Sequence, residues 1–91
     1  MELAFETSEL FATAQRMQID NNYVEAISMY ETIIEQDREN LSIYVRLGQL
    51  YNSLQLSDHA KNIYERGILL AKSAHNDRAV KHISFLLHEV K

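Results

Sequence analysis

The 91-residue sequence contains no cysteine and no proline, and it has only two glycines. Without cysteine, the chain can have no disulfide framework, no thiolate metal site and no cysteine nucleophile. The scarcity of glycine and the absence of proline argue against hairpin-rich β folds, whose tight turns depend on these residues. Hydrophobic residues make up 46% of the chain, so the composition favours a helical fold.

Long hydrophobic runs and an excess of positive charge are also missing. No apolar segment approaches the ~20 residues that span a bilayer, and the acidic residues of segment 1–6 are unlike a secretory signal. The formal net charge is −4, whereas phosphate binding by nucleic-acid-binding proteins needs a basic stripe. We therefore expect a cytoplasmic protein whose partners are neither membranes nor nucleic acids.

The residue patterns of the common catalytic and metal sites are absent as well. The chain has no glycine-rich phosphate loop, no nucleophile elbow and no paired carboxylates that would flank a cleft. His82 and His88 are six residues apart, which places them on different faces of a helix, unlike a zinc-binding helix motif. We predict no enzymatic activity, no metal and no cofactor.

Apolar residues recur at three- and four-residue spacing in five segments, which predicts amphipathic helices. The turns between these segments are short and polar, which favours antiparallel helical hairpins. Asn22, followed three residues later by Glu25, predicts a capping box at the second helix, and segment 75–77 offers a cap for the last one. The predicted helices span residues 8–19, 23–37, 42–54, 57–72 and 78–90.

The chain aligns with itself at an offset of 34 residues. Residues 7–40 laid over residues 41–74 give six identities, where ordinary residue frequencies would give roughly two. In both copies a small residue is followed four positions later by a tyrosine, so the two lie on one helix face. This period predicts stacked helical hairpins. The identical pairs are Ser8 and Ser42, Gln15 and Gln49, Ala26 and Ala60, Tyr30 and Tyr64, Glu31 and Glu65, and Ile34 and Ile68.

The period and its landmark residues resemble the tetratricopeptide repeat (TPR), a 34-residue helix-turn-helix unit. The first copy keeps Ala26 and Tyr30 of the second-helix pattern but departs from the family on its first helix. We expect the landmark tyrosines to pack between helices rather than to stack on bases. The second copy matches six landmark positions, with Tyr44, Leu47, Gly48, Tyr51, Ala60 and Tyr64.

The resemblance implies an all-α fold in which two TPR repeats and a C-terminal capping helix form a right-handed superhelical array. All of it would belong to a single domain over residues 1–91. A closing segment is expected because a repeat array otherwise leaves the apolar face of its last hairpin exposed. The implied bounds are residues 7–40 for repeat one, residues 41–74 for repeat two and residues 77–90 for the capping helix.

The capping helix could follow two registers relative to the repeats. An uninterrupted 34-residue count would bury Arg78 and Lys81, and burying unpaired cations is strongly unfavourable. Two extra residues in the preceding turn would instead bury an apolar set with one small residue, and this register is preferred. It predicts burial of Val80, Ile83, Ser84 and Leu87.

The first helices of successive repeats line a concave groove in TPR proteins, and this groove holds a peptide or a helical segment. The resemblance therefore implies a protein–protein interaction module that acts as an adaptor or is chaperone-like. The corresponding positions carry three fixed positive charges and no carboxylate. This predicts an acidic segment or a free carboxyl terminus as the ligand, gripped bidentately by arginine. The implied peptide-binding residues are Phe11, Gln15, Arg46, Gln49, Asn52, Arg78, Lys81 and Phe85.

Two alternatives remain open at this point. Phe11 and Phe85 either anchor a peptide or pack in the core, and the core is the more frequent place for an apolar residue of a helix. The cations of the last helix either bind a ligand or simply solvate its surface. The alternative function is a self-associating structural unit, in which Phe85, Leu86 and Val90 dock on a second copy to form a homodimer.

Overall fold

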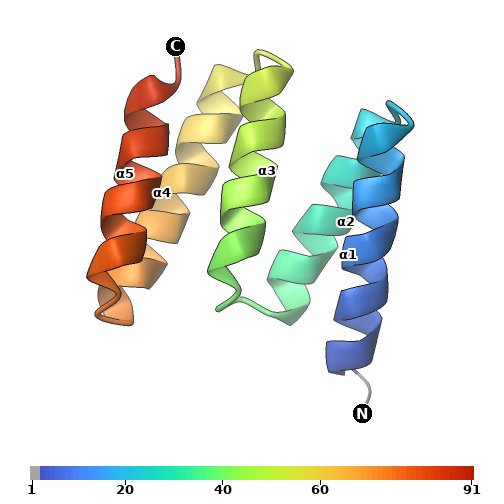
Figure 1. Ribbon diagram of the computed structural model, residues 1–91, viewed down its shortest axis with the longest axis horizontal. Helices are drawn as coiled ribbons and strands as arrows, with labels where there is room; N and C mark the ends of the chain where they lie inside the picture. The colour runs from blue at the N-terminus through green and yellow to red at the C-terminus, as the bar shows by residue number, and fades with distance from the viewer. Residues whose placement is uncertain (1–2) are drawn as a thin grey trace. The chain divides into compact units, whose positions relative to one another are not determined.

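Residues 3–91, whose backbone the structure describes, fold into five α-helices with no β-strand, as the computed structural model in Figure 1 shows. Side chains are described for residues 9–91. The predicted all-α class is confirmed. No helix in this range is both long and apolar enough to cross a bilayer. The helices are α1 (Leu3–Ile19), α2 (Tyr23–Gln36), α3 (Leu41–Ser53), α4 (Ser57–Ser73) and α5 (Asp77–Glu89).

The helix starts agree with the sequence to within one residue, except for α1. That helix begins at Leu3 and not at Ser8, so the predicted start was wrong. The apolar periodicity gave no earlier start, but residues 3–7 contain neither glycine nor proline and include good helix formers, so nothing stops the helix there. Residues 1–2 and the side chain of Ser8, which belongs to one of the repeat pairs, lie outside the described residues.

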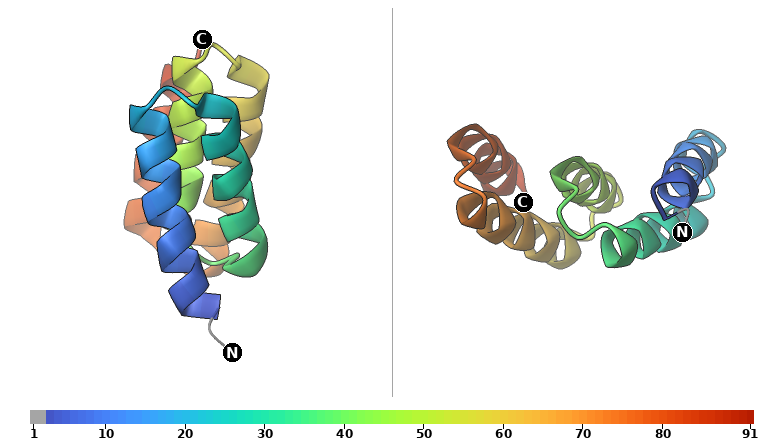
Figure 2. Two further views of the ribbon diagram at one scale, coloured as in Figure 1. Left: turned by 90° about the vertical axis from the view of Figure 1, so that its right-hand side faces the viewer. Right: turned by 90° about the horizontal axis from the view of Figure 1, so that it is seen from below.

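The helices form two compact units, residues 1–40 (unit 1) and residues 41–91 (unit 2). Unit 1 is the hairpin of α1 and α2. In unit 2, α4 contacts both α3 and α5, and these two helices lie on the same side of α4 (Figure 2). The single domain over residues 1–91 stays a prediction.

Three of the turns that join helices in residues 3–91 have the same backbone conformation. The second residue of each turn has a positive φ, between 56° and 66°, the left-handed conformation that commonly ends helices. The N–H of the following residue donates to the carbonyl oxygen five residues before it, at 2.7 to 2.9 Å. These bonds end each helix sharply without glycine or proline. The residues with positive φ are Asn21, Gln55 and His75.

The caps at the helix starts differ. Oδ1 of Asn76 accepts a hydrogen bond from the N–H of Ala79 at 3.0 Å, which confirms the cap predicted for α5. Asn22 stands at the start of α2, but its side chain makes no capping hydrogen bond. Its Nδ2 instead donates to Sδ of Met17 at 3.9 Å. The predicted capping box with Glu25 is therefore wrong, because the Asn22 amide is turned back toward the end of α1.

These two asparagines give a matched test of the capping energy. Asn76→Ala is expected to lower the free energy of unfolding by about 1 kcal/mol, the usual effect of losing a side-chain cap. Asn22→Ala should change it by less than about 0.5 kcal/mol, because no cap bond is lost. Urea denaturation followed by circular dichroism measures both. Equal losses in the two variants would contradict the difference in capping.

Gly48 lets α3 and α4 approach each other closely. A Cβ atom at this position would lie 2.7 Å from Cδ1 and Cζ of Tyr64 and nearer still to Cε1, which is too close for real atoms. Tyr64 is only 1% exposed, so its ring has no open space to move into. Burial also raises the pKa of Tyr64, since the phenolate would lose its hydration. The landmark glycine of repeat two is thus required by packing.

Replacing Gly48 with alanine is expected to destabilise the protein by about 1 to 2 kcal/mol. Overpacking a core costs about 1 to 3 kcal/mol, and the better helix propensity of alanine returns at most about 1 kcal/mol. Gly67→Ala is the control and should cost less, because its nearest neighbours would be 3.2 and 3.3 Å away. Thermal unfolding compares the two variants. A Gly48→Ala protein as stable as wild type would contradict this account of the α3–α4 packing.

The last helix is centred on Ile83, which is 1% exposed. A Cβ atom at Gly67 of α4 would lie 3.3 Å from Cδ1 of Ile83 and 3.2 Å from Cβ of Tyr44, so this glycine admits both neighbours. Val80 and Leu87 are half-buried, in agreement with the shifted register. Ser84 is exposed, and its predicted burial was wrong, because one residue beyond Ile83 the helix has turned by about 100°.

Candidate functional site

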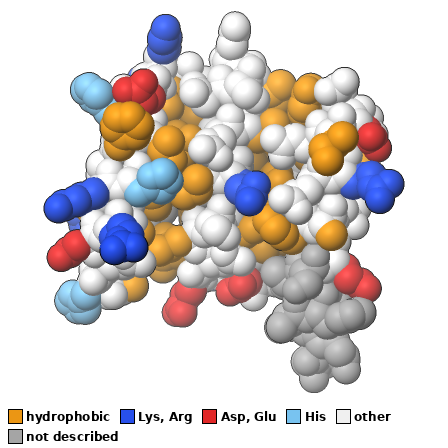
Figure 3. Space-filling model, in the orientation of Figure 1, with side chains coloured by type: hydrophobic (Ala, Val, Ile, Leu, Met, Phe, Trp, Pro, Cys, Tyr) orange, Lys and Arg blue, Asp and Glu red, His pale blue; other side chains and the backbone are white. Residues whose placement is uncertain are grey.

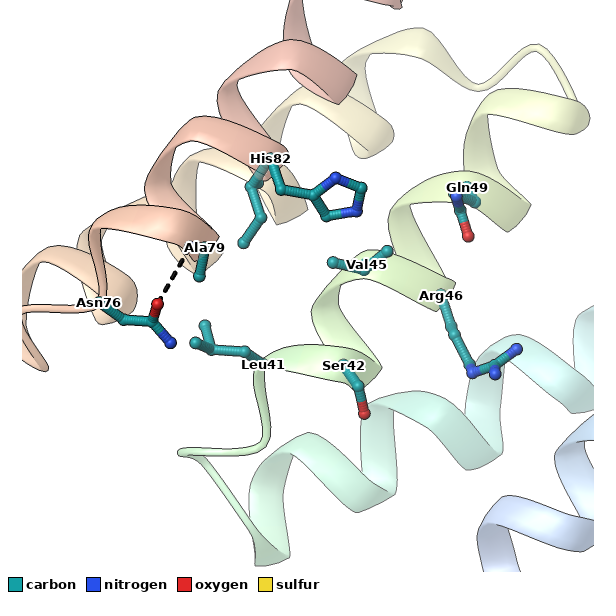
Figure 4. A pocket seen from close by; sticks show the side chains of 9 residues that line it. Leu41, Ser42, Val45, Arg46, Gln49, Asn76, Ala79 and His82 are labelled. Atoms are coloured by element: carbon teal, nitrogen blue, oxygen red, sulfur yellow. Dashed lines mark hydrogen bonds between the residues drawn. The ribbon is translucent and has the colours of Figure 1, made fainter.

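A groove with a volume of about 400 Å³ runs between α3 and α5, within unit 2 (Figure 4). Its lining combines an apolar floor with a polar rim, and none of the nine lining residues is Asp or Glu. The apolar lining residues are Leu41, Val45, Ala79 and Ile83, and the polar ones are Ser42, Arg46, Gln49, Asn76 and His82.

The amphipathic pattern of α3 supplies one wall of this groove. Its lining residues recur at three- and four-residue spacing, so they share a face of the helix. The neighbouring positions Ile43, Leu47 and Leu50 are at most 1% exposed and form the packed side of the helix. One face of α3 therefore packs in the core, and the adjoining face lines the groove.

The other wall comes from the first half of α5. In Figure 4 the ring of His82 and the side chain of Val45 point toward each other across the groove, whereas Arg46 points away from α5. The Asn76 side chain at the start of α5 is held by its hydrogen bond to the N–H of Ala79. An exposed imidazole and an exposed guanidinium thus flank an apolar strip.

Charge is distributed unevenly along the chain. Residues 41–91 contain seven Lys and Arg and four Asp and Glu, a net charge of +3, whereas residues 1–40 contain two and nine, a net charge of −7. Figure 3 shows hydrophobic side chains between α3 and α5, with Lys, Arg and His side chains beside them. The groove therefore belongs to the positively charged part of an acidic protein.

Two of the predicted peptide-binding residues, Arg46 and Gln49, line this groove. Asn52, Arg78 and Lys81 are exposed residues of unit 2 but do not line it. Lys81 precedes Ile83 by two residues, so it points about 200° around α5 from the buried side. The fixed positive charges of α5 thus lie outside the groove, and their role in binding stays a prediction.

Phe85 also lies two residues from Ile83 and is 61% exposed. The alternative that Phe85 packs in the core is therefore wrong. It does not line the groove between α3 and α5. This phenyl ring is an exposed apolar group on the outward face of α5.

The two predicted residues of unit 1, Phe11 and Gln15, are half-buried. The ring centroid of Phe11 lies 6.3 Å from that of Tyr30 in a tilted arrangement, so Phe11 packs inside the α1–α2 hairpin. The hydroxyl of Tyr30, a fully buried residue, donates to Oε1 of Gln18 at 3.1 Å. These contacts agree with the core alternative for Phe11, while peptide binding by Phe11 and Gln15 stays a prediction.

A second hollow, with a volume of about 420 Å³, lies in unit 1 between α1 and α2. It is lined by Glu9, Leu10, Thr13, Thr32 and Gln36, and neither Phe11 nor Gln15 takes part. Its lining includes a carboxylate, unlike the groove of unit 2. The two hollows therefore differ in charge, and the groove of unit 2 is the better candidate for binding an anionic segment.

Seven of the nine lining residues were not among the predicted peptide-binding residues, and three of these seven are Leu41, Asn76 and Ala79. All three lie in the first turns of α3 or α5 or just before them. The cap predicted over residues 75–77 was the available signal, because it marks where α5 begins. What the sequence did not show was that the starts of α3 and α5 lie next to each other.

The four histidines all belong to unit 2. The ring of His59 lies 5.1 Å from that of Tyr51, centroid to centroid, and His82 lines the groove. Among the side chains that the structure describes, no group of three or more His, Asp or Glu is placed to hold a metal ion. His59 thus contributes ring packing, and His82 contributes to the lining of the groove.

No family model matches the sequence, and no curated protein matches it significantly. Two solved structures of tetratricopeptide repeat domain proteins from Salinibacter ruber are similar to the whole fold. A solution NMR structure superposes with a TM-score of 0.84 at 24% identity, covering 93% of this chain and 86% of that chain. A crystal structure gives a TM-score of 0.76 at 24% identity, covering 92% and 93% respectively. The chain therefore has the fold of a small TPR-like protein.

The register of α5 can be checked by truncating one residue on each of its faces. Ile83→Ala is expected to lower the free energy of unfolding by about 2 to 4 kcal/mol, because it removes a buried side chain. Phe85→Ala should change it by no more than about 0.5 kcal/mol, since the ring is largely exposed. Urea denaturation measures both variants. A larger loss for Phe85→Ala than for Ile83→Ala would show that α5 is rotated from the position described.

Proposed function

We propose that this chain is a protein-interaction module that binds an acidic segment, or the free carboxyl terminus, of a partner protein in the groove between α3 and α5. One observation carries this proposal: the groove joins an apolar floor to a rim that contains Arg46 and His82 and no carboxylate. The TPR-like fold supports it in general terms, because such repeats present grooves between helices to their partners. The function is binding rather than catalysis.

The size of the groove limits what can enter it. A volume of about 400 Å³ lies at the lower end of the range of about 300 to 1,000 Å³ for ligand pockets. One or two side chains of a peptide fit such a space, and a folded domain does not. Apolar side chains of the peptide would contact Leu41, Val45 and Ala79, and Gln49 and Ser42 would hydrogen-bond the peptide backbone.

The positive charges of unit 2 would favour a negatively charged ligand. Arg46 can bind a carboxylate through two parallel hydrogen bonds, which a lysine cannot reproduce. Arg78 and Lys81 lie outside the groove on the same unit, so they would attract an anionic segment over a longer range without touching it. The affinity should therefore fall as salt is added.

Fluorescence anisotropy with labelled peptides tests this function. The probes are a peptide with acidic residues around one leucine, the same peptide with an amidated end, and a version with lysines in place of the acids. We expect the acidic peptide to bind and the lysine version not to bind. Loss of affinity on amidation would identify the free carboxyl terminus as the recognised group.

Two variants that each remove one positive charge then locate the site. Arg46→Ala should weaken binding about tenfold, as losing a charge-assisted pair does, while Lys81→Ala, outside the groove, should weaken it about twofold at most. Thermal unfolding of both variants checks that they remain folded. Equal effects of the two substitutions, or a preference for the lysine peptide, would overturn the proposal.

A second candidate function, self-association, is favoured by the exposure of one apolar residue. Three residues in or just after α5 were predicted to dock on a second copy. Leu86 is half-buried and Val90 is 9% exposed, so both already pack against the rest of the chain. Phe85, at 61% exposure, is available. We propose it as the contact residue of a homo-oligomer.

A further inference from the structure

We propose that copies of this chain associate head to tail, with the outward face of α5 on one copy docking against the outward face of α2 on the next. This inference rests on the second candidate function, self-association, and is independent of the peptide groove. Its basis is that the two faces are complementary in charge and match in the spacing of their side chains.

The outward face of α5, called here the basic face, consists of Arg78, Lys81, Phe85 and His88. All four are exposed. They recur at three- and four-residue spacing, so they form one stripe along the helix, on the side opposite Ile83. The stripe carries two fixed positive charges at its N-terminal end and the exposed phenyl ring beyond them.

The outward face of α2, called here the acidic face, consists of Val24, Ser28, Glu31 and Glu35. All four are exposed, and Val24 is 81% exposed. Their spacing also places them on one stripe of the helix, while the other side buries Ala26, Tyr30, Ile33 and Ile34. The stripe has an apolar residue at its N-terminal end and two carboxylates beyond it.

The spacing of these residues fixes an antiparallel register. Phe85 and Arg78 are seven residues apart, and so are Val24 and Glu31, which gives about 10.5 Å along each helix. With the two helices antiparallel and Phe85 on Val24, Arg78 lies opposite Glu31. Lys81 then lies opposite Ser28, within reach of Glu31 through its long side chain.

A parallel arrangement would lose this match. With Phe85 again on Val24, the cations of α5 would extend past the start of α2, away from its carboxylates. The charges that follow α2 also favour the antiparallel mode, because exposed Asp37 and Glu39 outnumber exposed Arg38 and add a net negative charge at that end of its face. The attraction between the positive end of the basic face and the negative end of the acidic face therefore favours the antiparallel orientation.

The contact is heterologous, because it joins the basic face of one copy to the acidic face of another. Each copy carries both faces. Such contacts build open chains of increasing length unless the rotation between copies closes a ring. The contact is expected to be weak, because exposed ion pairs contribute little and a single helix–helix contact buries less than a standard interface. It should weaken further with salt.

Sedimentation equilibrium of the full chain tests the mode of association. At low salt and at concentrations up to hundreds of micromolar, we expect the average mass of the wild type to rise beyond that of a dimer. One variant removes the basic face with Arg78→Gln, Lys81→Gln and Phe85→Ser. The other removes the acidic face with Val24→Ser, Glu31→Gln and Glu35→Gln. All six positions are exposed, and circular dichroism checks the fold of both proteins.

Each variant alone should be monomeric, because one of its two faces is missing. Their mixture should form 1:1 heterodimers that do not extend, since each protein retains the face that the other lacks. Arg46→Ala, which affects only the peptide groove, should associate like the wild type. This separates a failure of the groove proposal from a failure of this one.

Three results would overturn the proposal. A wild type that is monomeric at every concentration removes self-association altogether. An acidic-face variant that dimerises on its own, in a mixture where no heterodimers form, would indicate symmetric pairing through α5. Association that persists in both variants, or that does not respond to salt, would place the contact on other surfaces.

Discussion

The contact between Gly48 of α3 and the ring of Tyr64 of α4 is the constraint on which unit 2 depends. Because no side chain separates these two helices, α4 lies close enough to α3 for its own glycine, Gly67, to contact Tyr44. Because Gly67 has no side chain, Ile83, the central buried residue of α5, can also pack against α4 at this position. The two glycines of the chain thus bring three helices into contact, and the groove between α3 and α5 follows from that packing (Figure 4).

The chemical character of the groove follows from how each helix divides its faces. α3 and α5 bury one side against α4 and leave an adjoining side at the groove, so apolar floor residues such as Val45 sit beside polar ones such as Arg46. The acidic residues are concentrated in unit 1, and unit 2 is positive. One chain therefore presents an anion-attracting surface and an anionic surface, which suits both binding of an acidic segment and association of copies.

Much of the fold could be predicted from local pattern. The 34-residue period, the apolar stripes and the polar turns located the helix starts after α1, because each depends on residues that are close in sequence. The errors have equally local causes. α1 extends through five further residues that contain no helix breaker. Asn22 turns its amide to Met17 instead of capping α2, and Ser84 lies one residue past the centre of the buried face.

The sequence by itself determined that the chain is helical and that two hairpins share one period. These follow from residue spacing. Only the tertiary structure decided which residues form the groove and that Phe85 is exposed. Those outcomes depend on how far α5 is rotated about its axis, and a rotation of one residue, about 100°, exchanges a buried side chain for an exposed one.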